Sequence, residues 1–215
     1  MQKVILFQGD SITDCGRSRQ NLSDLGTGYP RLVASSLGLD HVEKYSVINR
    51  GISGNRIVDL YARIKSDIIN LKPDYMSILI GVNDTWHEIA DGNGVSTEKY
   101  EKIYDMLLTE IKQALPNIKI MILEPFVLKA AATEDCAEVP DRWQRFSSDV
   151  YEHAAAARRL AQKHGCKFIE LQKLFDEAAN KTDSPSYWLM DGVHPHPAGH
   201  ELIKREWLKA FEEIK

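Results

Sequence analysis

Several features of specialised proteins are missing from this 215-residue sequence. Its three cysteines (Cys15, Cys136 and Cys166) are widely spaced, odd in number and without a CxxC pair, which argues against a disulfide framework and a cysteine zinc site. No apolar run approaches the roughly 18 residues of a membrane span, and the N-terminal run Val4–Phe7 is too short for a secretion signal. These absences predict a cytoplasmic protein with reduced thiols and no membrane span.

An excess of positive charge is also missing. Lys and Arg total 27 against 31 Asp and Glu, a formal net charge of −4, and the basic residues are scattered among acidic ones. Such a chain has no electropositive field to attract phosphates, so nucleic acid is not expected as a partner. Linkers, repeats and low-complexity tracts are absent too, and the length predicts a single domain over residues 1–215. The oligomeric state stays open, with a homo-oligomer among the alternatives.

Short apolar runs alternate with longer segments that have helical spacing. We predict strands at about 3–8, 45–49, 75–80, 118–123 and 167–170. We predict helices at about 29–37, 57–70, 97–114, 141–164, 171–180 and 198–214. Strands that are almost continuously apolar are typical of a parallel sheet with helices on both faces. The sequence therefore predicts an α/β fold, a three-layer α/β/α sandwich with a mostly parallel sheet.

The first strand is followed by the segment Gly9-Asp10-Ser11-Ile12-Thr13. In parallel sheets, ligands gather at the carboxyl ends of the strands, so residues in these loops are the first candidates for chemistry. Gly9 allows the backbone to turn sharply out of the sheet, which makes Ser11 a suitable nucleophile. The alternative is an ordinary serine in a turn or at a helix N-cap.

Two further strand ends carry hydrogen-bond donors. Residues 49–55 (NRGISGN) follow the second strand, and their glycines Gly51 and Gly54 allow backbone N–H groups to approach a bound oxygen closely. Residues 81–84 (GVND) follow the third strand, where Asn83 offers a carboxamide donor. The alternatives are a tight strand-to-helix turn at Gly51 and an Asx turn at Asn83.

Near the C-terminus, the segment Asp191-Gly192-Val193-His194-Pro195 places a carboxylate and an imidazole on one loop. Proline and glycine exclude a helix here, so Asp191 and His194 are separated by a short stretch of loop. A carboxylate at that distance can accept the Nδ1 proton of the imidazole and leave Nε2 free to take a proton from a serine. This arrangement predicts an acid–base pair.

A metal site built from His194, His196 and His200 is the competing interpretation. It lacks a partner cluster of carboxylates, and HExxH is absent because no second histidine follows His87 at the needed spacing. Neither a P-loop nor a GxGxxG motif occurs, and Ser53 in GISGN misses the GxSxG elbow by its last glycine. We therefore expect neither a metal ion nor another cofactor.

Together, the four segments resemble the SGNH (GDSL-type) hydrolase superfamily, whose four blocks match here as GDSI, NRGISGN, GVND and DGVHP. The resemblance runs from residue 4 to about residue 200, and Ile12 stands where leucine is usual. It implies a flavodoxin-like sandwich with a five-stranded parallel sheet. It also implies a serine esterase that uses a catalytic triad and an acyl-enzyme and requires no metal.

The same resemblance assigns roles to individual residues. Ser11 is the implied nucleophile, activated by His194, which Asp191 orients. The implied oxyanion hole consists of the Ser11 backbone N–H together with Gly54 and Asn83. Asp10 and Asp84 are interpreted as braces of their loops and not as reactants.

The substrate is the least determined part of the prediction. The run Tyr187–Met190 ahead of DGVHPHPAGH resembles the bacterial branch that includes acetylxylan esterases, and Trp86, Trp143 and Trp188 fall near strand-end loops, where flat rings suit sugars. Ordinary packing is the alternative for each tryptophan. Residues 126–146 are polar, which favours a short acyl group. We expect an acetyl esterase acting on a small-molecule or oligosaccharide ester; a lysophospholipase or thioesterase and a non-catalytic carbohydrate-binding module are the alternatives.

Overall fold

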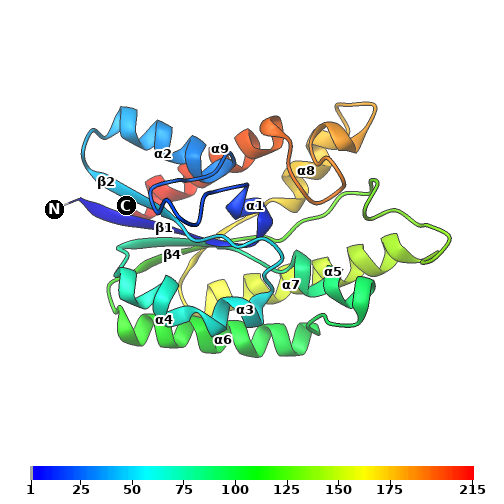
Figure 1. Cartoon of the computed structure of the whole chain (residues 1–215), viewed down its shortest axis with the longest axis horizontal. Helices are drawn as coiled ribbons and strands as arrows, with labels where there is room; N and C mark the ends of the chain where they lie inside the picture. The colour runs from blue at the N-terminus through cyan, green and yellow to red at the C-terminus, as the bar shows by residue number, and fades with distance from the viewer. Residues whose placement is uncertain (1) are drawn as a thin grey trace.

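The structure, a computed structural model, describes residues 2–215 (Figure 1). Within this range, five strands form one parallel sheet: β1 (Lys3–Gly9), β2 (Tyr45–Asn49), β3 (Tyr75–Leu79), β4 (Lys119–Leu123) and β5 (Lys167–Ile169). Their order is β2-β1-β3-β4-β5, the flavodoxin-like arrangement. In this order the chain changes direction across the sheet between β1 and β3, so the loops after these two strands border one crevice.

Helices cover both faces of the sheet, which confirms the predicted three-layer sandwich. In Figure 1, α2, α8 and α9 lie on one side, and α3, α4, α6 and α7 lie on the other. The described helices are α1 (Ser11–Asp14), α2 (Tyr29–Asp40), α3 (Ile57–Ala62), α4 (Ile64–Asp67), η1 (Ile69–Leu71), α5 (Val82–Asp91), α6 (Thr97–Ala114), α7 (Arg142–Lys163), α8 (Gln172–Ala179), η2 (Pro185–Tyr187) and α9 (Pro197–Ile214).

The apolar strands result from burial on both sides. Successive residues of a strand point to opposite faces, and β1 divides its side chains accordingly between two apolar clusters. Ile5 and Phe7 belong to the cluster that contains Trp207 of α9, and Leu6 belongs to the cluster under α3 and α6. Phe7 stacks on Trp207 with ring centroids 5.2 Å apart. Among residues 2–215, no helix has the length and apolar character needed to cross a membrane.

The predicted helix over residues 57–70 is wrong as a single element. It is divided into α3, α4 and η1, with the first interruption at Arg63 (φ −107°, ψ 16°). At this point the Arg63 guanidinium donates to the carbonyl oxygens of Arg50 at 2.7 Å and Gly9 at 3.3 Å. Long-range contacts therefore override the local helical pattern at this position.

Helix α5 was not predicted, although it directly follows β3. Its first turn contains Asn83, Asp84 and Thr85, which compete with the backbone for hydrogen bonds and are poor helix formers. A helical signal was nevertheless present, because apolar residues recur at Val82, Trp86 and Ile89 and the helix stops at Gly92. The four-residue helix α1 was not predicted either, because Ser11, Thr13 and Asp14 are also poor helix formers.

Candidate active site

Ser11 is the first residue of helix α1, directly beyond the carboxyl end of the central strand β1. The preceding residue, Asp10, is the N-cap, and its Oδ1 accepts the backbone N–H of Ile12 at 3.0 Å. This contact holds the turn that presents the Ser11 side chain. Ser11 Oγ lies 2.8 Å from Nε2 of His194, which is 183 positions away in the chain.

His194 and Asp191 lie on a loop that is closed by its own hydrogen bonds. Leu189 and Pro195 form an isolated β-bridge, and the Met190 N–H donates to the carbonyl oxygen of His194 at 2.8 Å. Inside the loop, Asp191 Oδ2 lies 2.7 Å from Nδ1 of His194. Its Oδ1 accepts the backbone N–H groups of Val193 and His194 at 2.9 and 2.8 Å. The carboxylate is thus fixed by the backbone as well as by the imidazole.

This loop is also anchored to the segment that follows β4. The N–H of Leu128 donates to the carbonyl oxygen of Gly192, and the N–H of Ala132 donates to that of Asp191, each at 2.9 Å. Thr133, a fully buried residue, closes the supporting turn through its hydroxyl, which donates to the carbonyl oxygen of Leu128 at 2.6 Å. The acid–base pair is therefore supported by two segments of the chain.

The charges of the pair are coupled. Burial raises the pKa of Asp191, but hydrogen bonds from the His194 ring and from the N–H groups of His194 and Val193 outweigh it and lower this pKa to about 2. The hydrogen bond to Asp191 raises the pKa of His194 against the effect of burial. When His194 is neutral with its proton on Nδ1, Nε2 can only accept, so the Ser11 hydroxyl donates to it. The contact has the geometry for proton transfer from serine to histidine.

Three hydrogen-bond donors near Ser11 remain available to a ligand. Among residues 2–215, the backbone N–H groups of Ser11 and Gly54 have no acceptor. Asn83 uses one proton of Nδ2 to bind the carbonyl oxygen of Asn55 at 3.1 Å, and an amide nitrogen carries a second. These are the donor groups that the sequence predicted for an oxyanion hole.

Direct contacts hold the segment after β2 against α1. The N–H of Ile52 donates to the carbonyl oxygen of Gly9 at 3.1 Å, and both the N–H and the hydroxyl of Ser53 donate to Asp14 Oδ2 at 2.9 Å. A Cβ at Gly51 would lie 2.4 Å from the backbone nitrogen of Asp14, so only glycine permits this approach. The two segments therefore meet beside Ser11.

Asp10 and Asp84 each bind a backbone N–H group rather than a reactive side chain. Both carboxyl oxygens of Asp84 accept from the N–H of Ile57, at 3.1 and 3.3 Å, at the start of α3. Burial raises the pKa of Asp10 to about 7 and that of Asp84 well above its ordinary value. These contacts join β1 to α1 and α5 to α3.

The three predicted substrate-binding tryptophans occupy different surroundings. Trp86 lies at the site, with its ring centroid 5.9 Å from that of His194 and 5.6 Å from that of Phe146. Trp188 instead pairs with Tyr187 at 5.0 Å. Trp143 is partly buried, and all three tryptophans pack against the apolar cluster that contains Trp207 of α9. Only for Trp86 does an aromatic contact with the Ser11–His194–Asp191 group follow from the described residues.

The three histidines of the metal interpretation make separate contacts. His200 is buried; its Nδ1 accepts the Tyr29 N–H at 3.2 Å, and its Nε2 lies 3.5 Å from Cys15 Sγ. Burial lowers the pKa of His200 to about 4, with a smaller contribution from His194. His196 is the N-cap residue of α9. In the part of the chain that is described, no three His, Cys, Asp or Glu side chains are grouped to hold a metal ion.

Sequence reasoning missed two residues that contact the donor segment. Arg63 Nε donates to Asn55 Oδ1 at 2.9 Å, and His87 Nε2 lies 3.1 Å from the carbonyl oxygen of Gly54. A signal existed for His87, which is four residues after Asn83 and therefore on the same face of a helix. That signal required α5 to be recognised first.

Comparison with known proteins places this arrangement in context. Residues 7–202 match the GDSL-like Lipase/Acylhydrolase family. The chain is 34% identical to acetylxylan esterase of Geobacillus stearothermophilus, over 98% of this chain and 95% of that protein. A crystal structure of that esterase gives a TM-score of 0.81 at 33% identity and covers 97% of this chain and 93% of its own.

Two further proteins are similar over most of this chain. The crystal structure of a GDSL-like lipase from Parabacteroides merdae is 36% identical, with a TM-score of 0.89 and coverage of 99% of this chain and 97% of its own. The isoamyl acetate-hydrolyzing esterase 1 homolog of Bos taurus is 28% identical over 94% of this chain and 78% of its own length. The family match over residues 7–202 includes all four loops described above.

Proposed function

The chain belongs to the GDSL-like lipase/acylhydrolase family, and on that premise we propose that it is a serine esterase that removes acetyl groups from carbohydrates. Its family and its esterase relatives make it a carboxylic ester hydrolase. The observation that supports a serine nucleophile is the continuous hydrogen-bonded series from Ser11 through His194 to Asp191, at 2.8 and 2.7 Å.

In the proposed reaction, Ser11 Oγ attacks the ester carbonyl carbon while His194 Nε2 takes the hydroxyl proton. The ionised Asp191 stabilises the imidazolium that forms. Collapse of the tetrahedral intermediate breaks the bond to the alcohol oxygen, which receives the proton from His194. Water then attacks the acyl-enzyme with His194 again as the base, so that acetate and free Ser11 are released.

The negative oxygen of each tetrahedral intermediate needs hydrogen-bond donors. The N–H groups of Ser11 and Gly54 and the second proton of Asn83 Nδ2 serve this purpose in the proposal, since they lack other acceptors among residues 2–215. Such donors stabilise charge that develops only during the reaction, and the loss of one typically costs about 10²–10³ in rate.

Two observations support a short acyl group. Trp86 packs beside His194, where an aromatic ring limits the space next to the reacting atoms. The relatives from Geobacillus stearothermophilus and Bos taurus are named for an acetylated xylan and for isoamyl acetate, both of which are acetyl esters. The 34% identity to the acetylxylan esterase favours a carbohydrate as the alcohol.

The test compares acyl lengths and alcohols in one set of assays. Nitrophenyl esters of two to about eight acyl carbons should be hydrolysed most efficiently at two carbons, and acetate should be released from acetylated xylo-oligosaccharides. Ser11→Ala should abolish both activities while circular dichroism shows an unchanged fold. Activity that rises with acyl length would instead identify a lysophospholipase- or thioesterase-type enzyme. A folded wild-type protein that a serine-directed organophosphate does not label would indicate a binding module.

A further inference from the structure

Three side chains of helix α5 bind backbone groups of the segment that follows β2. His87 Nε2 lies 3.1 Å from the carbonyl oxygen of Gly54, and Asn83 Nδ2 lies 3.1 Å from that of Asn55. Asp84 accepts the N–H of Ile57 at 3.1 Å. One short helix thus binds the backbone of this segment from Gly54 to the start of α3.

The direction of the His87 hydrogen bond follows from its acceptor. A carbonyl oxygen cannot donate, so Nε2 of His87 carries a proton and donates it to Gly54. Asn83 and His87 are four residues apart and share one face of α5. Two side chains one helical turn apart therefore bind two consecutive carbonyl groups, those of Gly54 and Asn55.

Gly54 needs such a constraint. Its φ of +81° lies in the left-handed region, and a glycine without side-chain contacts has more accessible backbone conformations than any other residue. Packing contributes little here, because a Cβ built on Gly54 would have one described non-neighbouring atom within 4 Å, His87 Nε2 at 3.9 Å. The carbonyl side of Gly54 is held by His87, and its N–H has no acceptor within residues 2–215.

We propose that His87 is a positioning residue that orients Gly54 so that its N–H points at the oxygen of the tetrahedral intermediate. The inference rests on the proposed function, because it assigns a supporting residue to the same oxyanion hole. His87 acts through Gly54 and makes no contact with the substrate in this role. Replacement of His87 retains the Gly54 N–H group but allows the Gly54 backbone to rotate. The N–H is then no longer held toward the oxygen on which charge develops.

The test uses three replacements that separate hydrogen bonding from bulk. His87→Phe keeps a ring without a donor, His87→Gln keeps an amide nitrogen at a comparable reach, and His87→Asn shortens that reach. We expect His87→Phe and His87→Asn to lower kcat by about ten- to a hundredfold with KM changed less than about threefold. We expect His87→Gln to recover most of the lost kcat. His41→Phe is the matched control and should retain full activity, because His41 lies before the amino end of β2 and the site lies at the carboxyl ends of the strands.

A second measurement detects a role in the oxyanion hole specifically. A thionoester substrate places sulfur where the ester places oxygen, and sulfur is the weaker hydrogen-bond acceptor. His87→Phe should therefore slow the ester more than the thionoester, and the ratio of the two rates should move toward that of Asn83→Ala. A purely structural defect would slow both substrates equally. Thermal melting shows whether each variant is folded. If His87→Phe does not fold, His87→Gln and His87→Asn are compared instead.

The outcomes distinguish this inference from the proposal beneath it. Undiminished activity in Ser11→Ala would overturn the proposed function itself. If Ser11→Ala is inactive but His87→Phe keeps the wild-type kcat and rate ratio, the positioning role alone is wrong. Equal losses in His87→Gln and His87→Phe would also overturn it, since a retained donor would then confer no benefit.

Discussion

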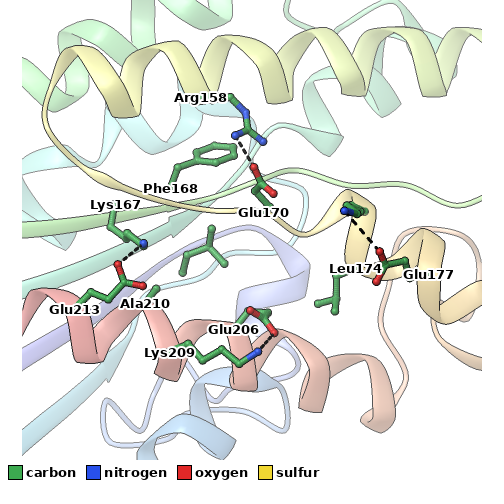
Figure 2. Close-up of a pocket in the computed structure, with 12 residues that line it drawn as sticks. Arg158, Lys167, Phe168, Glu170, Leu174, Glu177, Glu206, Lys209, Ala210 and Glu213 are labelled. Atoms are coloured by element: carbon green, nitrogen blue, oxygen red, sulfur yellow. Dashed lines mark hydrogen bonds and ion pairs between the residues drawn. The ribbon is translucent and has the colours of Figure 1, made fainter.

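Two regions of the molecule contain closely paired charges: the groove beside β5 and the Ser11–His194–Asp191 group. They differ in the contacts that fix the charged side chains. Figure 2 shows the groove, a cavity of about 560 Å³ between α7, α8 and α9. It contains four ion pairs: Arg158–Glu170, Lys167–Glu213, Lys173–Glu177 and Lys209–Glu206. The pairs join long side chains to one another, and each base there faces an acid.

Distance alone does not separate the two regions. Lys209 lies 2.6 Å from Glu206, and His194 lies 2.7 Å from Asp191. The groove pair has one strongly exposed partner, because Lys209 is 70% exposed and Glu206 is 29% exposed, whereas His194 and Asp191 are 32% and 31% exposed. Long exposed side chains lose conformational freedom when they pair and gain little in water. The Asp191 carboxylate, which two backbone N–H groups hold, keeps one geometry, as the proposed catalysis requires.

The comparison is tested most severely by Asp191→Asn. The amide retains the size of the carboxylate but removes its charge and allows the imidazole to adopt the wrong tautomer, so kcat should fall by about 10⁴-fold. Steady-state kinetics on an acetyl ester measures the loss. Asp183→Asn, an exposed aspartate on the loop before η2, should behave like the wild type. Near-normal turnover by Asp191→Asn would remove this residue from the proposed triad.

Asn83→Ala tests the donor side of the site and should cost about 10²–10³-fold in kcat, with a smaller change in KM. The reason is that the amide would bind the charged intermediate more strongly than the ground state. Asn180→Ala, at the exposed end of α8, serves as the control. If Asn83→Ala raises KM and leaves kcat intact, the amide binds the substrate uniformly and does not belong to an oxyanion hole.

The pH dependence of kcat/KM tests the electrostatic coupling between Asp191 and His194. His194 must be neutral to accept a proton, and Asp191 raises its pKa above 6.5, so kcat/KM should fall about tenfold per pH unit below this raised pKa. Asp191, with a pKa of about 2, stays ionised throughout this fall. In Asp191→Asn the acid limb of the residual activity should move to lower pH. Asp10→Asn is the control, because it removes a buried carboxyl group with a pKa of about 7. The acid limb of the pH profile should persist in this variant. A flat profile from about pH 4 to 9 would exclude His194 as the base.

The smallest effect is expected in the groove. Lys209→Gln removes one exposed ion pair and should change the free energy of unfolding by less than about 0.5 kcal/mol, with no change in kcat or KM. Urea denaturation monitored by circular dichroism measures the stability. Exposed ion pairs contribute at most about 1 kcal/mol. A loss of about 2 kcal/mol or more in the free energy of unfolding would therefore show that this pair stabilises the fold more than its exposure indicates.

Much of the scaffold could be predicted because one simple rule dominates it. Strands that are buried on both faces are mostly apolar, and the predicted strand at 75–80 overlaps β3, whose five residues are all buried. The predicted helix at 97–114 agrees with α6, whose apolar residues form one buried face. The same rule locates the loops at the carboxyl ends of the strands. It therefore explains why Ser11 and Asn83, on either side of the point where the strand order reverses, could be singled out from sequence.

The remaining features depend on contacts between distant segments. The interruption at Arg63 coincides with hydrogen bonds to Gly9 and Arg50, and the contact of His87 with Gly54 spans 33 positions. Local propensity contains no information about such pairs, because the same residues would read as an ordinary helix or loop elsewhere. The catalytic roles of Ser11, His194 and Asp191 and the substrate-binding roles of the tryptophans stay predictions until the variants are measured.

The 183 positions between Ser11 and His194 have a consequence for the protein's synthesis. A nascent chain emerges from the ribosome from its N-terminus, so the serine and the loop after β2 are exposed long before the histidine is made. Until residues 188–196 have emerged and closed their loop, the hydroxyl has no partner to take its proton. Under the proposed mechanism, the unfinished polypeptide therefore has no base for Ser11 and should not hydrolyse esters before the loop that contains His194 has closed.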